Sequence, residues 1–138
     1  MLGSDHSAAC LAYLGDAAFE LWVRKTLFTC GVATTSSFNT EALLFVTAKA
    51  QSAALTNIEP LLTEEESDAY KRGRNAHVTP PKSASAAEYH RATGLEALIG
   101  ALYIEGQESR IDQLLNAAFA DVIADVTARH GDKDRSAR

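Results

Sequence analysis

Apolar residues recur at helical spacing along most of the chain, and no stretch alternates apolar and polar residues for long enough to predict a sheet. This periodicity is the feature that most restricts the fold, because it leaves packed helices as the way to bury a core. We expect an all-α domain over residues 1–130, followed by a polar, disordered tail over residues 131–138. The predicted helices cover residues 7–30, 40–56, 63–74, 86–105 and 110–129.

Turn-forming residues and helix caps set the predicted boundaries. Residues 34–39 are expected to form a polar break, and residues 75–85 a proline-containing loop. Thr63 precedes Glu66 by three residues, which is the pattern of a capping box at a helix N-terminus. Ser109 is predicted to cap the last helix in a similar way.

Composition excludes several classes of protein. The 138 residues are 46% hydrophobic and 22% charged, and no Cys/His cluster indicates a zinc site or a disulfide framework. No stretch reaches the roughly 18 apolar residues of a membrane span, and the N-terminus lacks a signal-peptide pattern, so we expect a cytoplasmic protein with no membrane partner. The net charge of -5 disfavours nucleic-acid binding unless acidic residues form a metal site and basic residues cluster elsewhere.

The first candidate site lies in the helix predicted over residues 7–30. Gly15 costs roughly 1 kcal/mol relative to Ala in mid-helix, which indicates a close helix contact or room for a ligand. Asp16 lies in an apolar stretch, where an unpaired carboxylate is expensive to bury. Glu20 follows at i+4 on the same helix face. The two carboxylates either lie beside a bound cation or, with Glu20 paired to Arg24, form a solvated acidic face.

The second candidate site is Glu96, a lone carboxylate among small and apolar residues that shares a helix face with Thr93 and Gly100. Taken alone, it is also the pattern of a paired glutamate at the rim of a helical bundle. Carboxylates from two packed helices are the usual way in which a helical fold holds Mg²⁺. Asp16 and Glu96 are therefore the predicted Mg²⁺ ligands, and the predicted chemistry is phosphodiester hydrolysis.

The densest basic cluster in the chain ends the helix predicted over residues 63–74, and its members are Lys71, Arg72, Arg74 and Asn75. Cations at a helix C-terminus also stabilise the helix dipole, so a structural role is an open alternative. In the functional interpretation these side chains follow RNA phosphates, and Asn75 bonds to sugar or base edges. His90 and Arg91 extend this predicted RNA-binding track. Lys49 and Gln51 are weaker functional candidates, and a solvated helix face is the favoured interpretation of both.

At these residues the sequence resembles the ribonuclease III family. The stretch AYLGDAAFE (residues 12–20) resembles the signature helix of that family, and GLEALIGALYIEG (residues 94–106) resembles its second acidic helix. The stretches FVTAKAQ (residues 45–51) and KRGRNA (residues 71–76) are similar to the Mini-ribonuclease III branch, whose members have only the catalytic domain. The resemblance covers roughly residues 9–118 and implies the family's helical bundle without a separate double-stranded-RNA-binding domain.

The resemblance also implies which residues act. The family gathers Mg²⁺ with four carboxylates, and their positions here hold Asp16, Glu96, Ala12 and Thr93. The Mini-ribonuclease III branch shares the loss of two carboxylates, which leaves open whether one or two metal ions bind. We expect Glu20 to compensate in part, through water.

The implied protein is a homodimer with two active sites along its interface, each cutting one strand of an RNA duplex. Tyr13 lies where the family has an aromatic residue that contacts the partner subunit, with ordinary core packing as the alternative. The implied products carry 5′-phosphate and 3′-hydroxyl ends. The implied substrate is precursor ribosomal RNA of the large subunit, in ribosome biogenesis, presented with the help of a ribosomal protein.

Two other functions compete with this interpretation. One is a non-catalytic RNA-binding or ribosome-assembly factor that has kept the fold, which the two missing carboxylates motivate. The other is an all-α nucleotide pyrophosphohydrolase that would use the acidic run Glu64–Asp68 as its metal motif. The pairs of carboxylates that such an enzyme needs on a second helix are absent from the sequence.

Overall fold

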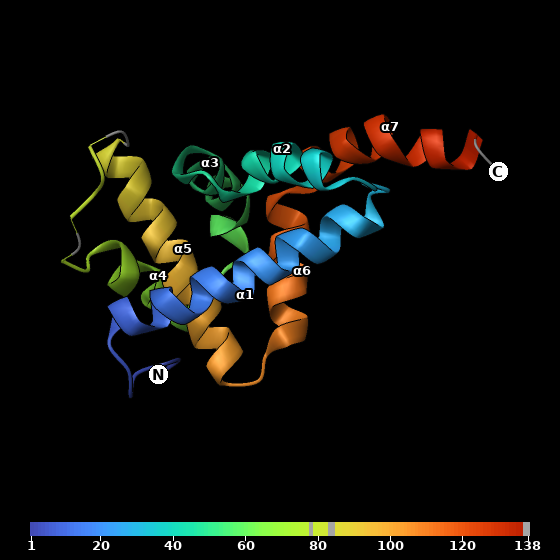
Figure 1. Cartoon of the computed structure of the whole chain (residues 1–138). Helices are drawn as coiled ribbons and strands as arrows, with labels where there is room; N and C mark the ends of the chain where they lie inside the picture. The colour runs from blue at the N-terminus through green and yellow to red at the C-terminus, as the bar shows by residue number, and fades with distance from the viewer. Residues whose placement is uncertain (78, 83–84, 137–138) are drawn as a thin grey trace.

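The computed structural model describes residues 1–77, 79–82 and 85–136, and these contain helices and no strand (Figure 1). The helices are α1 (Ala8–Thr29), α2 (Thr35–Val46), α3 (Ala48–Ile58), α4 (Glu64–Arg74), α5 (Ala86–Ile104), α6 (Glu108–Ala118) and α7 (Ala120–Ser136), with a 3₁₀ turn, η1 (Glu59–Leu61), after α3. The predicted all-α class is confirmed.

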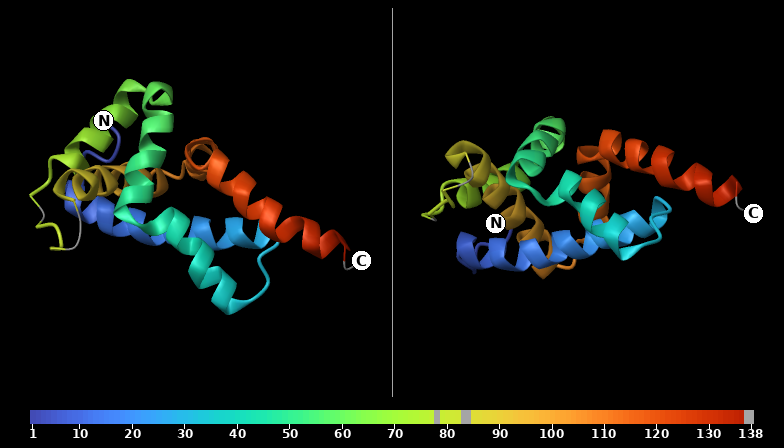
Figure 2. Two further views of the ribbon diagram at one scale, coloured as in Figure 1. Left: turned by 90° about the horizontal axis from the view of Figure 1, so that it is seen from above. Right: turned by 45° about the horizontal axis from the view of Figure 1, so that its top comes forward.

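The helix α5 is the centre of the bundle, with α1, α3 and α4 packed against it (Figures 1 and 2). Every residue of α5 from Ala92 to Leu102 is buried except Glu96. A helix that is apolar all round is buried on all sides, so a carboxylate in its middle must be explained by a site or a partner.

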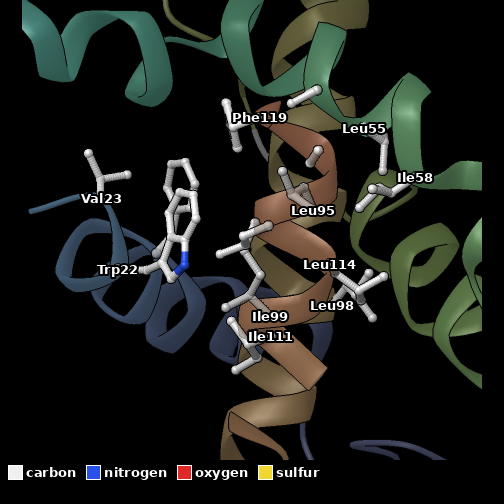
Figure 3. Packing of buried hydrophobic residues seen from close by; sticks show 14 of the residues in the cluster. Trp22, Val23, Leu55, Ile58, Leu95, Leu98, Ile99, Ile111, Leu114 and Phe119 are labelled. Carbon is white, nitrogen blue, oxygen red and sulfur yellow. The ribbon is translucent and has the colours of Figure 1, made fainter. Parts of the chain in front are cut away.

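The core joins side chains from helices that are distant in sequence. Figure 3 shows it between α1, α3, α5 and α6; the labelled residues are Trp22, Val23, Leu55, Ile58, Leu95, Leu98, Ile99, Ile111, Leu114 and Phe119. Phe119 connects α6 to α7, and its ring lies 5.1 Å from that of Phe45, 5.7 Å from Phe19 and 5.8 Å from Trp22, measured between centroids. This aromatic cluster fixes the C-terminal helices against α1 and α2.

Two predicted helices are each divided in two, and the breaks have structural causes. Thr47 is extended (φ −71°, ψ 152°), and its hydroxyl accepts the Ala50 backbone N–H, so it ends α2 and caps α3. Phe119 (φ −111°, ψ 21°) separates α6 from α7 because its ring enters the aromatic cluster. The predicted break at residues 34–39 is wrong, since the hydroxyl of Thr34 accepts the Ser37 N–H and starts α2 at Thr35.

Other boundary predictions have mixed outcomes. The capping box of Thr63 and Glu66 is confirmed, with both reciprocal hydrogen bonds present. The predicted cap at Ser109 is wrong, because α6 begins at Glu108, two residues before the predicted start, and its N-cap residue, Gln107, makes no side-chain cap bond. The helix α7 continues across residue 131, where the polar tail was predicted to begin, and projects from the bundle in Figure 1. The domain boundary at residue 130 stays a prediction, and residues 137–138 lie outside the described residues.

Candidate active site at the crossing of α1 and α5

The two predicted catalytic carboxylates meet where α1 crosses α5. Asp16 of α1 and Glu96 of α5 line one surface cavity of about 370 Å³. Its remaining walls are formed by Ala9, Ala12, Tyr13, Tyr89 and Thr93. The predicted convergence of the two acidic helices is therefore present in the structure.

Two glycines make this convergence possible by letting the helix backbones touch. A Cβ atom built on Gly15 would lie 1.7 Å from the carbonyl oxygen of Glu96, and one built on Gly100 would lie 1.9 Å from the carbonyl oxygen of Leu11. Real side chains cannot approach a backbone this closely, so only glycine fits at either position. Gly15 thus serves a close helix contact, one of the two roles that its mid-helix position predicted.

The electrostatic state of Glu96 follows from this packing. Burial raises the pKa of Glu96 to about 8, and the nearby charge of Asp16 and a hydrogen bond with its carboxyl group add to the rise. A polar contact with Gln51 acts in the opposite direction. Asp16 itself is exposed at the cavity. A bound cation would favour the charged form of Glu96, because it would screen the repulsion between the two carboxylates.

Gln51 is a residue whose surroundings the sequence analysis predicted wrongly. Its side chain is buried, with 3% of its surface exposed, so the predicted solvated face is wrong for Gln51. Its Nε2 donates to the backbone oxygen of Val46 at 3.2 Å. A sequence signal existed, because Gln51 shares one helix face with Ala54, Leu55 and Ile58, which are all buried.

The two positions where the family has further carboxylates lie in the same cavity. Ala12 and Thr93 are both buried, and both line it. The hydroxyl of Thr93 donates to the backbone oxygen of Tyr89 at 3.0 Å. Within the described residues, no group of three or more Asp, Glu, His or Cys side chains is placed to hold a metal ion. Asp16 and Glu96 are therefore the carboxylates that the cavity offers.

Glu20 lies one helical turn from Asp16, but it takes part in different contacts. Its carboxylate is 3.4 Å from the guanidinium group of Arg24, as in the pairing that the sequence left open. It lines another groove, between α1 and α2, and not the cavity of Asp16 and Glu96. A role for Glu20 toward a metal ion stays a prediction.

Two of the predicted RNA-binding arginines are bonded within the protein. Arg72 donates to the backbone oxygen of Leu2 at 2.5 Å, which holds the N-terminal segment on the bundle. Arg91 donates to Ser52, Thr56 and Glu59, and so fastens α5 to α3 and η1. Both guanidinium groups are thus structural, whatever they add to RNA binding.

The other members of the predicted RNA-binding track differ in their exposure. Lys49, Lys71 and Asn75 are exposed. The guanidinium group of Arg74 lies over the Tyr70 ring, 5.5 Å from its centroid, and donates to Asn75. His90 is half-buried. The three exposed side chains are therefore available to a polyanion.

The acidic run of α4 has structural partners. Glu66 is buried, closes the capping box with Thr63, and accepts two hydrogen bonds of 2.8 Å from Arg110 of α6. These bonds lower the pKa of Glu66, with the hydrogen bond from Arg110 as the largest cause. This arrangement disfavours the pyrophosphohydrolase alternative, which needs the run as a metal motif.

The most exposed aromatic residue of α1 is Tyr13, at 87%. It lies on the rim of the cavity, and its exposure excludes core packing within the subunit, which was the alternative to a dimer contact.

Among the described residues, no helix combines the length and the apolar character that a membrane span requires.

Comparison with known proteins agrees with this fold. The Ribonuclease III domain family matches residues 9–107. The Mini-ribonuclease 3 of Symbiobacterium thermophilum is 48% identical over 114 residues, covering 82% of this chain and 87% of the relative. That of Brevibacillus brevis is 42% identical, covering 81% and 84%. A crystal structure of a Fusobacterium nucleatum protein has a TM-score of 0.76 at 37% identity, covering 84% of this chain and 95% of the other.

The fold, the acidic crossing and the family match define the class: the chain belongs to the ribonuclease III family and is an endoribonuclease that acts on double-stranded RNA. Within that family it belongs to the Mini-ribonuclease III branch, as its similarity to relatives of that name over about four-fifths of its length shows. The recognition from residues 45–51 and 71–76 is confirmed.

Proposed function

We propose that Asp16 and Glu96 form the catalytic centre of a Mg²⁺-dependent enzyme that cleaves both strands of an RNA duplex. The observation that carries the proposal is the meeting of these two carboxylates in one cavity at the glycine crossing of α1 and α5. Carboxylates on two rigid, packed helices keep their relative position better than carboxylates on loops, as a catalytic centre requires.

The donor set suits Mg²⁺, which prefers carboxylate oxygens and keeps several waters in its coordination shell. The cavity of about 370 Å³ leaves room for those waters and for a phosphate, because Ala12 and Thr93 present small side chains to it. Asp16 and Glu96 would hold the ion. When bound, Mg²⁺ would supply positive charge toward the scissile phosphate and lower the pKa of an attacking water.

For RNA binding we propose that the exposed Lys49, Lys71 and Asn75, together with Arg74, contact the backbone of the duplex. Arg91 contributes by fastening α5, which carries Glu96, to α3, and Arg72 by holding the N-terminal segment on the bundle. A contact of His90 with RNA stays a prediction. Recognition of this kind depends on the A-form shape more than on base sequence. Duplex binding should weaken steeply as salt rises, because the contacts are to phosphates.

The active unit is proposed to be a homodimer, with Tyr13 at the subunit contact. The support is the exposure of Tyr13 at the cavity rim and of further large apolar residues on α1 and α2, namely Leu21, Phe28, Leu43 and Leu44. If Tyr13→Ala stayed dimeric at low micromolar concentration in sedimentation experiments, Tyr13 would not be a main dimer contact.

The natural substrate is proposed to be precursor ribosomal RNA of the large subunit, cut to leave 5′-phosphate and 3′-hydroxyl ends and presented by a ribosomal protein. Family membership is the support for this finer assignment. Cleavage of a precursor duplex should therefore exceed that of an arbitrary duplex of equal length, and end-labelling of the products should detect the 5′-phosphate.

The decisive experiment incubates the protein with a long RNA duplex in Mg²⁺ or in EDTA, beside Asp16→Asn. Asp112→Asn is the matched control, because Asp112 is an exposed aspartate of α6 outside the cavity. We expect Mg²⁺-dependent cutting by the wild type and by the control, and its loss in Asp16→Asn. Equal cutting by Asp16→Asn would remove Asp16 from the catalytic centre.

A non-catalytic RNA-binding factor is the second candidate function, and the observation in its favour is the presence of Ala12 and Thr93 where the family has carboxylates. It predicts duplex binding without cutting under every metal and salt condition. The same incubation, read by gel shift as well as by cleavage, separates the two functions.

A further inference from the structure

We infer that Tyr89 is a substrate-binding residue, whose hydroxyl donates a hydrogen bond to a phosphate of the RNA duplex next to the scissile one. The inference rests on the proposed function of Asp16 and Glu96 and adds an RNA contact within their cavity. The lysines, the arginine and the asparagine proposed above to bind RNA do not line this cavity, whereas Tyr89 does.

The first observation is the place of Tyr89 in the cavity, which lies between one face of α1 and one face of α5. On α5 the lining residues are Tyr89, Thr93 and Glu96, which are three or four positions apart and therefore share a helix face. Tyr89 is half-buried and precedes Glu96 by two helical turns, or roughly 10 Å along the helix axis. This spacing places Tyr89 beside a phosphate next to the scissile one, and not at the metal site itself.

The second observation is that the cavity offers a phosphate two acids and few hydrogen-bond donors. None of the described residues that line it is Lys, Arg or His. Phosphate oxygens are acceptors, so a phosphate beyond the reach of the metal ion needs donors from the protein. The lining side chains that can donate are the hydroxyl groups of Tyr13, Tyr89 and Thr93.

The third observation is how these three hydroxyls are used. The Thr93 hydroxyl donates its one proton to the backbone oxygen of Tyr89 at 3.0 Å. Tyr13 is 87% exposed on the rim and is proposed to contact the partner subunit. The Tyr89 hydroxyl takes part in no hydrogen bond within the described residues, and it is not one of their buried polar atoms without a partner, so solvent reaches it. It therefore remains available to donate to the RNA backbone, as tyrosine hydroxyls do in nucleic-acid complexes.

Tyr89→Phe tests the inference, because it removes the hydroxyl and keeps the ring. Tyr103→Phe is the matched control: Tyr103 lies on the same helix, two turns after Glu96, is 40% exposed, and lines a different pocket. The measurements are KM and kcat for cleavage of a short RNA duplex in Mg²⁺ at several salt concentrations, and the melting temperature of each variant.

We expect Tyr89→Phe to raise KM about 10-fold, the effect of losing a hydrogen bond to a charged group. Its kcat should stay near the wild-type value, because the bond is made equally before and during the reaction. Its melting temperature should also be unchanged, since the hydroxyl has no partner in the protein.

The salt dependence separates this neutral contact from a charged one. The dependence of KM on salt should be that of the wild type in Tyr89→Phe, because no positive charge is removed, whereas Lys71→Ala should lower the slope by about 1. Tyr103→Phe should match the wild type in every quantity. An unchanged KM in Tyr89→Phe, an equal rise in Tyr103→Phe, or a rise that comes with a lower melting temperature would overturn the inference.

Asp16→Asn in the same assay tests the proposed function by itself. Cutting lost in Asp16→Asn, with a wild-type KM in Tyr89→Phe, overturns only the role of Tyr89. Cutting kept in Asp16→Asn, with a raised KM in Tyr89→Phe, overturns the catalytic role of Asp16 and leaves Tyr89 as an RNA contact. If the protein binds duplexes without cutting them, the dissociation constant from fluorescence anisotropy replaces KM, with the same expected change of about 10-fold.

Discussion

Two glutamates on neighbouring helices, the buried Glu66 on α4 and the half-buried Glu96 on α5, have opposite electrostatic surroundings. Glu66 accepts two hydrogen bonds from Arg110 and belongs to a capping box, and its pKa is lowered. Glu96 faces the carboxylate of Asp16, and its pKa is raised to about 8. The protein supplies a positively charged partner for Glu66, the guanidinium group of Arg110. The charge that acts on Glu96 is instead that of a second acid, Asp16.

This difference is the one expected between a structural carboxylate and the proposed metal ligand. The charge of Glu66 contributes to folding, because its positively charged partner is part of the chain. The charge of Glu96 opposes folding of the metal-free protein, which fits the proposed role of Glu96 as a metal ligand and does not fit a role in stability. The following substitutions test whether stability and activity divide between the two residues in this way.

The largest effect is expected from Glu96→Gln. Cleavage of duplex RNA in Mg²⁺ should fall about 100-fold or more, since even the loss of an outer partner of a metal ligand costs 10- to 100-fold. The melting temperature of the metal-free variant at pH 8 should rise, because a buried and repelled charge is removed. Cleavage assays and calorimetry on the same preparation measure both. If Glu96→Gln kept its activity but were less stable than the wild type, Glu96 would be the structural carboxylate of the two.

Glu66→Gln should give the opposite pattern at a smaller magnitude. The free energy of unfolding should fall by roughly 2–3 kcal/mol, because a neutral amide cannot replace the charge-assisted bonds to Arg110. Cleavage per folded molecule at 25 °C should be retained. Urea unfolding measures the first quantity and initial rates the second. Loss of activity in a fully folded variant would show that the acidic run of α4 has a catalytic role.

The pH dependence of stability gives the smallest effect. The pKa of Glu96 is higher in the folded chain (about 8) than in the unfolded chain (4.5), so the folded state holds more protons and stability falls as pH rises between these values. For Glu66, whose folded pKa is lowered, stability is present above pH 4.5 and is lost as pH falls below it. Metal-free protein should therefore be most stable near pH 5.

Thermal unfolding in EDTA between pH 4 and pH 8.5 checks this expectation. The melting temperature should fall by several degrees from pH 5 to pH 8, at about 4 °C for each kcal/mol lost. Glu96→Gln should flatten this branch of the curve, and Glu66→Gln should flatten the acid branch. If the slope above pH 5 were the same in Glu96→Gln, other groups would be its cause.

Local signals in the sequence determined much of this protein. Helical periodicity gave the all-α class, the capping box of Thr63 and Glu66 located the start of α4, and the lone carboxylates Asp16 and Glu96 marked the two acidic helices. These features are readable because helix caps and helix faces depend on residues three or four positions apart. Family motifs then identified the class of enzyme.

Tertiary structure alone decided the rest. The break at Phe119 has no local signal, since it follows from a ring that packs on α1 and α2. The burial of Gln51, the internal bonds of Arg72 and Arg91, and the raised pKa of Glu96 all depend on helices distant in sequence. The physical reason is that burial and electrostatic interaction depend on distances in space between helices. The spacing of residues along one helix does not determine these distances.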